Sequence, residues 1–137
     1  MKSTNYFDTY IAPAEDCPAG SSIPPPESDS PTVARMQFDM LCGHPFEYTS
    51  DDVLFTVFAD RQDIPQGERA TARDQFFAKG QPCFRSSPLT KRYSWGIYSD
   101  QEGKIALIET GSDTQLSMDE NPDIKKVYAM RNKRKSG

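Results

Sequence analysis

The sequence predicts an α+β fold, with a small antiparallel sheet covered on one face by two to four helices. Two observations lead to this prediction: apolar residues recur at helical spacing in the first half of the chain, and after Lys91 their period changes to two. A chain of 137 residues has the size of one domain. We therefore expect a single domain over residues 1–131, followed by a basic, disordered tail over residues 132–137.

The chain opens with a predicted strand and a long loop. Residues 3–12 mix aromatic residues with threonine, which is typical of a strand. Residues 13–30 are rich in proline, serine and aspartate and contain few apolar residues, so they predict a loop. Ser30 followed by Pro31 suits the cap and first residue of a helix, and a helix is predicted over residues 31–42.

Two further helices are expected before the sheet. Residues 51–60 begin with two aspartates, which suit the first turn of a helix, but their VLFTVF stretch is rich in strand-forming residues. We favour the helix and keep the strand as the alternative. The next helix is predicted from Pro65 to Lys79, because Gly80 and Pro82 follow and stop it.

The second half of the chain predicts most of the sheet. Residues 93–98 alternate between two faces, DQEG supplies a turn and KIALIE follows, which indicates a β-hairpin. The alternation places Trp95 on the core face and Tyr98 on the other. A short helix is predicted over residues 112–120, and a final strand over residues 124–131.

Charge is distributed unevenly along the chain. Residues 1–123 carry 10 basic and 20 acidic side chains, a formal charge of −10, whereas residues 124–137 carry +6. Nucleic-acid binding needs a broad positive face, so nucleic acid is not the expected partner.

The sequence also predicts a soluble, cytoplasmic protein. It contains no apolar run of about 18 residues that could span a bilayer, and its N-terminus lacks the apolar core of a secretory signal. Its three cysteines are odd in number and irregularly spaced, which suits reduced thiols in the cytosol. We expect no membrane partner.

The candidate site lies in the segment from Gln81 to Tyr98, which combines a thiol with cations, hydroxyls and aromatic rings. The window from Gln75 to Ser99 contains no acidic residue and has a formal charge of +4. Guanidinium and hydroxyl groups suit the binding of a carboxylate or phosphate. The predicted ligand-binding residues are Arg85, Ser86, Ser87, Lys91 and Arg92. The alternative is that aspartates elsewhere neutralise these cations in structural ion pairs.

Two side chains of this segment are candidates for catalysis. Cys83 lies near Arg85, whose charge favours the nucleophilic thiolate, and Tyr93 can transfer a proton. A cysteine nucleophile usually needs a base, however, and nothing in the sequence brings the only histidine, His44, close to Cys83. A packed thiol and a core tyrosine are the alternatives.

We expect no cofactor and no metal. Cys42 and His44 are two residues apart, but no second pair with zinc-ligand spacing accompanies them. The sequence contains no glycine-rich phosphate loop and no G-x-S-x-G or H-E-x-x-H motif.

Several phrases of the sequence together resemble a family of small uncharacterised proteins, a domain of unknown function found in bacteria and fungi. The phrases are NYFDTYI with AEDCP, YTSDDVLF, QFFAKGQPCFRSSPLTKRYSWGIYSDQEGKIAL and KKVYAMRNKR. The resemblance covers nearly the whole chain. It implies no activity, cofactor or catalytic residue.

Three hypotheses for function follow from the residues. The first is a protein that binds a small anionic or polar molecule in a basic pocket, with or without cofactor-independent catalysis. The second is a non-catalytic interaction module that binds nucleic acid or protein through its basic loop and tail. The third is that the segment from Gln81 to Tyr98 only stabilises the fold.

Overall fold

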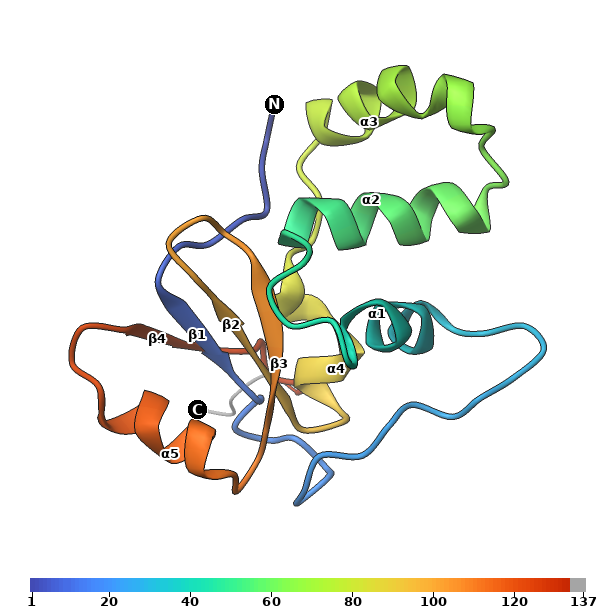
Figure 1. Cartoon of the computed structure of the whole chain (residues 1–137). Coiled ribbons are helices and arrows are strands. Elements are labelled where there is room, and N and C mark those ends of the chain that lie inside the picture. Colours follow the sequence, from blue (N-terminus) through green and yellow to red (C-terminus); the bar gives the residue numbers. More distant parts are fainter. Residues whose placement is uncertain (134–137) are drawn as a thin grey trace.

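The computed structural model describes residues 1–133 (Figure 1). Its elements in chain order are β1 (Thr9–Ala12), α1 (Val33–Leu41), α2 (Ser50–Arg61), the 3₁₀ turn η1 (Gln66–Glu68), α3 (Arg69–Ala78), the 3₁₀ turn η2 (Phe84–Ser86), α4 (Pro88–Lys91), β2 (Trp95–Ser99), β3 (Ile105–Glu109), α5 (Asp113–Glu120) and β4 (Lys125–Tyr128). The predicted α+β class is confirmed. Within this part of the chain, no helix is both long and apolar enough to cross a membrane.

The sheet has the strand order β3-β2-β1-β4. The β2–β3 hairpin is antiparallel, as predicted, and β1 pairs antiparallel with β2. In contrast to the expected antiparallel sheet, β4 lies parallel to β1, so the sheet is mixed. The reason is the connection through α5: it carries the chain from β3 across the sheet to the far edge, and such a crossover returns the next strand in the same direction.

Helices lie on both faces of the sheet, whereas the sequence predicted one covered face. On one face, Ile11, Ile97 and Ile105 pack against residues of α1, α2 and α4. On the other, Tyr10 and Ile108 pack with residues that include Met118 of α5, and Figure 1 shows α5 on the side of the sheet opposite α1. The predicted alternation of β2 is confirmed, because Trp95 packs on the first face and Tyr98 on the second.

Residues 50–61 are a helix, so the strand alternative for this segment is wrong. Thr49 caps the helix in a reciprocal pair with Asp52, each side chain accepting a hydrogen bond from the other residue's backbone N–H. The strand-like pattern has a simple cause. Residues two apart point to nearly opposite sides of a helix, and α2 is buried on two sides: Val53 and Val57 face the sheet core, whereas Phe55 and Ala59 face Phe77 of α3.

The two other predicted helices of this region form with shifted starts. Helix α1 begins after Thr32, whose side chain accepts a hydrogen bond from the N–H of Arg35, instead of after Ser30. Helix α3 begins at Arg69 because residues 66–68 form a 3₁₀ turn. Helix α3 packs on α2, and the α2–α3 pair extends to one side of the sheet (Figure 1).

The segment before β2 contains two short elements where a loop was expected. Ser87 caps α4 by accepting a hydrogen bond from the N–H of Leu89, and Pro88 occupies the first helical turn. Phe84 and Leu89 are buried in the main core. The segment therefore contributes to the core as well as to the surface.

The proline-rich loop contains no helix or strand, as predicted, but it is attached to the body of the protein. The indole N–H of Trp95 donates to the carbonyl of Ile23 at 2.8 Å, and the Ile23 N–H donates to the carbonyl of Tyr93 at 3.1 Å. The start of the predicted tail is also attached, because the carboxylate of Asp16 accepts the backbone N–H groups of Asn132 and Lys133. Residues 134–137 lie outside the described residues.

Candidate functional site

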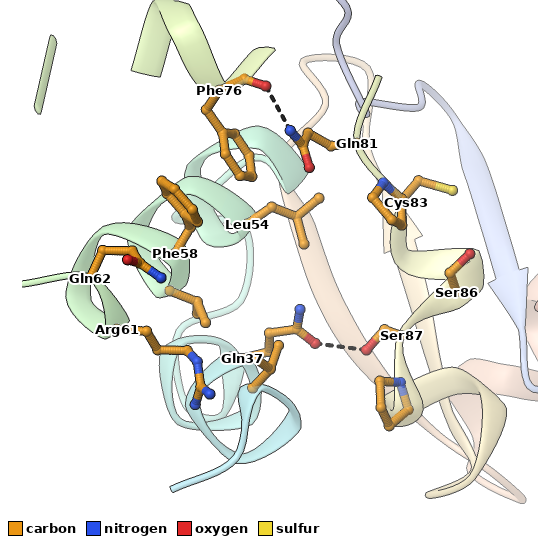
Figure 2. A pocket seen from close by; sticks show the side chains of 14 residues that line it. Gln37, Leu54, Phe58, Arg61, Gln62, Phe76, Gln81, Cys83, Ser86 and Ser87 are labelled. Atoms are coloured by element: carbon orange, nitrogen blue, oxygen red, sulfur yellow. Dashed lines mark hydrogen bonds between the residues drawn. The ribbon is translucent and has the colours of Figure 1, made fainter. Parts of the chain in front are cut away.

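A cavity of about 290 Å³ lies between α1, α2, the end of α3 and the segment that leads into α4. Its lining residues are Val33, Gln37, Leu54, Val57, Phe58, Arg61, Gln62, Phe76, Gln81, Pro82, Cys83, Ser86, Ser87 and Pro88. Figure 2 shows Gln37 and Arg61 toward one end of this cavity and Phe76 and Gln81 toward the other. The cavity therefore has two chemically different ends.

The polar end is built on Gln37 of α1, which is 3% exposed. The hydroxyl of Ser87 donates to Gln37 Oε1 at 2.7 Å. Ser87 Oγ itself accepts from the N–H of Leu89, so its proton is free to make this bond. The pairing fixes the amide with its nitrogen toward Leu54 (Figure 2). Among the described residues, Gln37 Nε2 has no hydrogen-bond partner, and no buried side-chain nitrogen or oxygen there lacks one, so this nitrogen is accessible from the cavity and presents two N–H donors to it.

The walls and the opposite end are mainly apolar, although Gln81 also lies at that end. Leu54 and Val57 come from α2, and the rings of Phe58 and Phe76 lie with their centroids 4.7 Å apart at an interplanar angle of 36°. Gln81 Nε2 donates to the carbonyl of Phe76 at 2.7 Å, which ties the end of α3 to the following segment. Apolar walls with a few placed polar groups are typical of small-molecule sites.

The charge at the cavity comes from Arg61, in the last turn of α2. Among residues 1–133, Arg61 is the one cationic residue that lines it, and no acidic residue does. The guanidinium donates to the carbonyl of Pro31 through Nη1 at 3.1 Å. Its other N–H groups have no hydrogen-bond partner within residues 1–133, so they are available to an anion at this end.

Three of the predicted site residues line the cavity: Cys83, Ser86 and Ser87. The hydroxyl of Ser87 is used by its hydrogen bond to Gln37. The hydroxyl of Ser86 lies 3.1 Å from the sulfur of Met130. The sulfur of Cys83 lies 3.4 Å from the hydroxyl of Tyr6, and Figure 2 shows it directed away from Leu54. The thiol therefore belongs to the wall of the cavity and does not point into it.

The other predicted site residues do not line this cavity. Arg85 donates through Nε to the carbonyl of Tyr128 at 2.7 Å and borders a separate shallow hollow beside β4. Lys91 accepts a hydrogen bond from Asn132 at its carbonyl, Arg92 is exposed, and Tyr93 is half-buried against the proline-rich loop. Among residues 1–133, none of the ion pairs involves Arg85, Lys91 or Arg92.

Tyr6 is a neighbour of Cys83 that the sequence did not single out. Burial raises the pKa of Tyr6, the hydrogen bond with Cys83 raises it further, and the nearby guanidinium of Arg85 opposes the rise. The phenol therefore keeps its proton at neutral pH. Within the described residues, no three His, Cys, Asp or Glu side chains gather closely enough to hold a metal ion.

The lining residues that sequence reasoning missed include Gln37, Leu54, Phe58, Arg61 and Phe76. One of them carried a usable signal. Gln37 occupies the same helical face as Ala34, Phe38 and Leu41, all buried, and a glutamine at a core position needs a polar partner.

A family model described as a family of unknown function (DUF6157) matches residues 1–135. The chain belongs to this family. The match confirms the resemblance to a family of unknown function. It assigns no activity to the cavity. No curated protein and no solved structure matches the chain at a significant level.

Proposed function

We propose that this protein binds a small carboxylic acid with an apolar body in the cavity between α1, α2 and the segment Gln81–Pro88. The observation that carries the proposal is the amide of Gln37: its oxygen is fixed by Ser87, and its nitrogen, unpartnered within the described residues, is accessible from the cavity. A ligand oxygen placed there accepts these N–H groups in place of water, in a geometry that Ser87 has already fixed.

The remaining lining groups support the same chemistry. The apolar walls favour a hydrocarbon body, and the guanidinium of Arg61 at the polar end favours a negative charge. The proposal keeps the small anionic ligand expected from the sequence. The cation proposed to pair with the ligand is Arg61, because Arg85, Lys91 and Arg92 do not line the cavity.

The proposed function is reversible binding, without an assigned reaction. The sulfur of Cys83 is engaged with Tyr6, and Tyr93 lies outside the lining residues. We also propose that the protein acts in the cytoplasm, since Cys17, Cys42 and Cys83 are all free thiols, which persist in a reducing compartment.

Calorimetric titration of the purified protein with hexanoate tests the proposal. Replacing Gln37→Leu removes the two donors and is expected to weaken binding roughly 2- to 12-fold, the value of a neutral hydrogen bond. Gln37→Glu retains an oxygen for Ser87 but faces the ligand with a negative charge, so it is expected to abolish binding. Both variants are checked by thermal unfolding, because the site is buried.

An arginine pair supplies the matched control. Arg61→Gln is expected to weaken hexanoate binding roughly 2- to 5-fold, as for an exposed ion pair, whereas Arg92→Gln, outside the cavity, leaves it unchanged. If Arg92→Gln lost hexanoate binding and Arg61→Gln kept it, the anion would bind at the basic segment before β2 and not in this cavity. Absence of hexanoate binding by the unmodified protein would refute the proposal.

A further inference from the structure

A second hollow adjoins the apolar end of the cavity. It has a volume of about 610 Å³ and lies along α2 and α3. Three of its lining residues, Phe58, Phe76 and Gln81, also line the first cavity. The two hollows therefore lie on either side of the Phe58–Phe76 ring pair.

The rings that separate the hollows are partly exposed. Phe58 is 36% exposed and Phe76 is half-buried, in contrast to the neighbouring Phe77, which is 0% exposed. Side chains at the surface change rotamer on a timescale of picoseconds to nanoseconds. The shared lining of Phe58, Phe76 and Gln81 makes the exposed surface of this ring pair the boundary that a ligand in both hollows would cover.

The polar groups determine which part of a ligand reaches this boundary. A carboxylate held at Gln37 and Arg61 occupies the end opposite Phe76 (Figure 2), so the hydrocarbon body extends toward the phenylalanines. Beyond them, Ile64 and Ala72 continue the apolar surface, and Gln75 and Lys79 border it. The two hollows follow one another from Gln37 to Ala72, and this elongated arrangement suits a linear chain better than a branched or polycyclic body.

We propose that the ligand is a straight-chain fatty acid whose carboxylate lies at Gln37 and whose chain passes over the Phe58–Phe76 ring pair into the second hollow. This inference rests on the proposed function, since it takes the position of the carboxylate from it. It adds a selection by chain length: acids that end before the rings use one hollow, and longer acids use both.

A series of saturated acids from butanoate to dodecanoate, titrated calorimetrically into the full chain below their micelle concentrations, measures this selection. Each methylene buried is expected to tighten binding roughly fourfold. The increase continues past hexanoate if the chain enters the second hollow. An affinity that levels off at hexanoate, or that is equal for octanoate and the bulkier adamantane carboxylate, overturns the inference.

A variant in the second hollow separates specific from non-specific binding of long chains. Gln75 is exposed and lines the second hollow but not the first, so Gln75→Trp places an indole in the path of a long chain without disturbing the core. It is expected to leave hexanoate binding unchanged and to weaken dodecanoate binding at least tenfold. Equal affinity of Gln75→Trp and the unmodified protein for dodecanoate overturns the inference.

The two proposals fail in different ways. If hexanoate binds in a Gln37-dependent manner but chain length and Gln75→Trp have no effect, the carboxylate site stands and the extended path is wrong. If no acid of the series binds, the proposed function itself is wrong.

Discussion

Asp51 is a buried carboxylate whose partners come from the first residues of the chain. It is 1% exposed and accepts hydrogen bonds of 2.7 Å from the Ser3 hydroxyl, the Thr4 N–H and the Thr4 hydroxyl. Its own N–H donates to the side-chain oxygen of Asn5. A carboxylate in the first turn of α2 is also favoured by the helix dipole. This one side chain thus attaches the N-terminal segment to α2.

We expect Asp51→Asn to lower the free energy of unfolding by about 1–3 kcal/mol, because one acceptor becomes a donor that faces other donors. Urea denaturation measures the change. Asp74→Asn, an exposed carboxylate of α3, is the matched control and should stay within about 0.5 kcal/mol of the unmodified protein. Similar losses in the two variants would show that Asp51 contributes only surface charge.

At the scale of elements, the sheet depends on a close approach between β1 and β2. A Cβ placed on Gly96 would lie 2.5 Å from Tyr10 Cε1 and 2.8 Å from the Tyr10 hydroxyl oxygen. Tyr10 is 1% exposed, and burial is the main cause that raises its pKa to about 12. Only glycine leaves room for this ring on the face that α5 covers.

Gly96→Ala is therefore expected to destabilise the protein by about 1–3 kcal/mol, the usual cost of overpacking a core. The control is Gly67→Ala in η1, where no atom lies within 4 Å of an added Cβ. That substitution should be neutral or stabilising, by up to about 1 kcal/mol. Thermal unfolding of both variants is a sufficient measurement, and an unaffected Gly96→Ala would mean that β2 can shift away from Tyr10.

The sequence predicted those elements whose pattern depends on one buried face. The β2–β3 hairpin shows a clean period of two, and α1 and α3 show helical periods with caps, so each was found to within a few residues. Helix α2 was ambiguous because it is buried on two sides. The direction of β4 was missed because strand direction depends on the path of α5, which local patterns do not contain.

The cavity was predictable only in part, for a similar reason. Cys83, Ser86 and Ser87 lie in the conspicuous segment, but their partners Gln37, Leu54 and Phe58 come from helices read as core. A cavity forms where two elements fail to fill the space between them. Its lining depends on tertiary packing and cannot be read from residues that are neighbours in sequence.

At the scale of the whole molecule, both ends of the described chain are held against the same core. The N-terminal segment is attached through Asp51, and the C-terminal segment through Asp16, which accepts hydrogen bonds from Asn132 and Lys133. The N–H of Asn132 and the other donors lower the pKa of Asp16 to about 2, from an ordinary value of 3.8. The attachment of the C-terminal segment to Asp16 is therefore expected to weaken in acid.

The sign of this dependence follows from the lowered pKa. Ionised Asp16 stabilises the folded state above pH 3.8, and the contribution is lost as the pH falls toward about 2. We expect Asp16→Asn to be less stable than the unmodified protein near neutral pH, with a difference that shrinks between pH 3.8 and about 2.

Urea unfolding of both proteins across this range measures the effect of Asp16. The pKa of Asp52 is also lowered. Burial raises this pKa, but the hydrogen bonds with Thr49 and Arg73 and the charge of Arg73 together lower it by more. It is present in both proteins, so its contribution cancels in the difference. A difference that stays constant with pH would show that hydrogen bonding alone, without the charge of Asp16, holds the C-terminal segment.

The position of β1 in the middle of the sheet has a consequence for synthesis of the protein. This strand is synthesised before the other strands of the sheet, and its partners β2 and β4 both lie in the last third of the 137 residues. Tyr10 and Ile11 are each 1% exposed in the folded protein, but they have no partner strand until β2 and β4 have been synthesised. The nascent chain therefore carries an unpaired apolar strand until β2 and β4 have been synthesised, and exposed apolar strands of this kind are prone to aggregation.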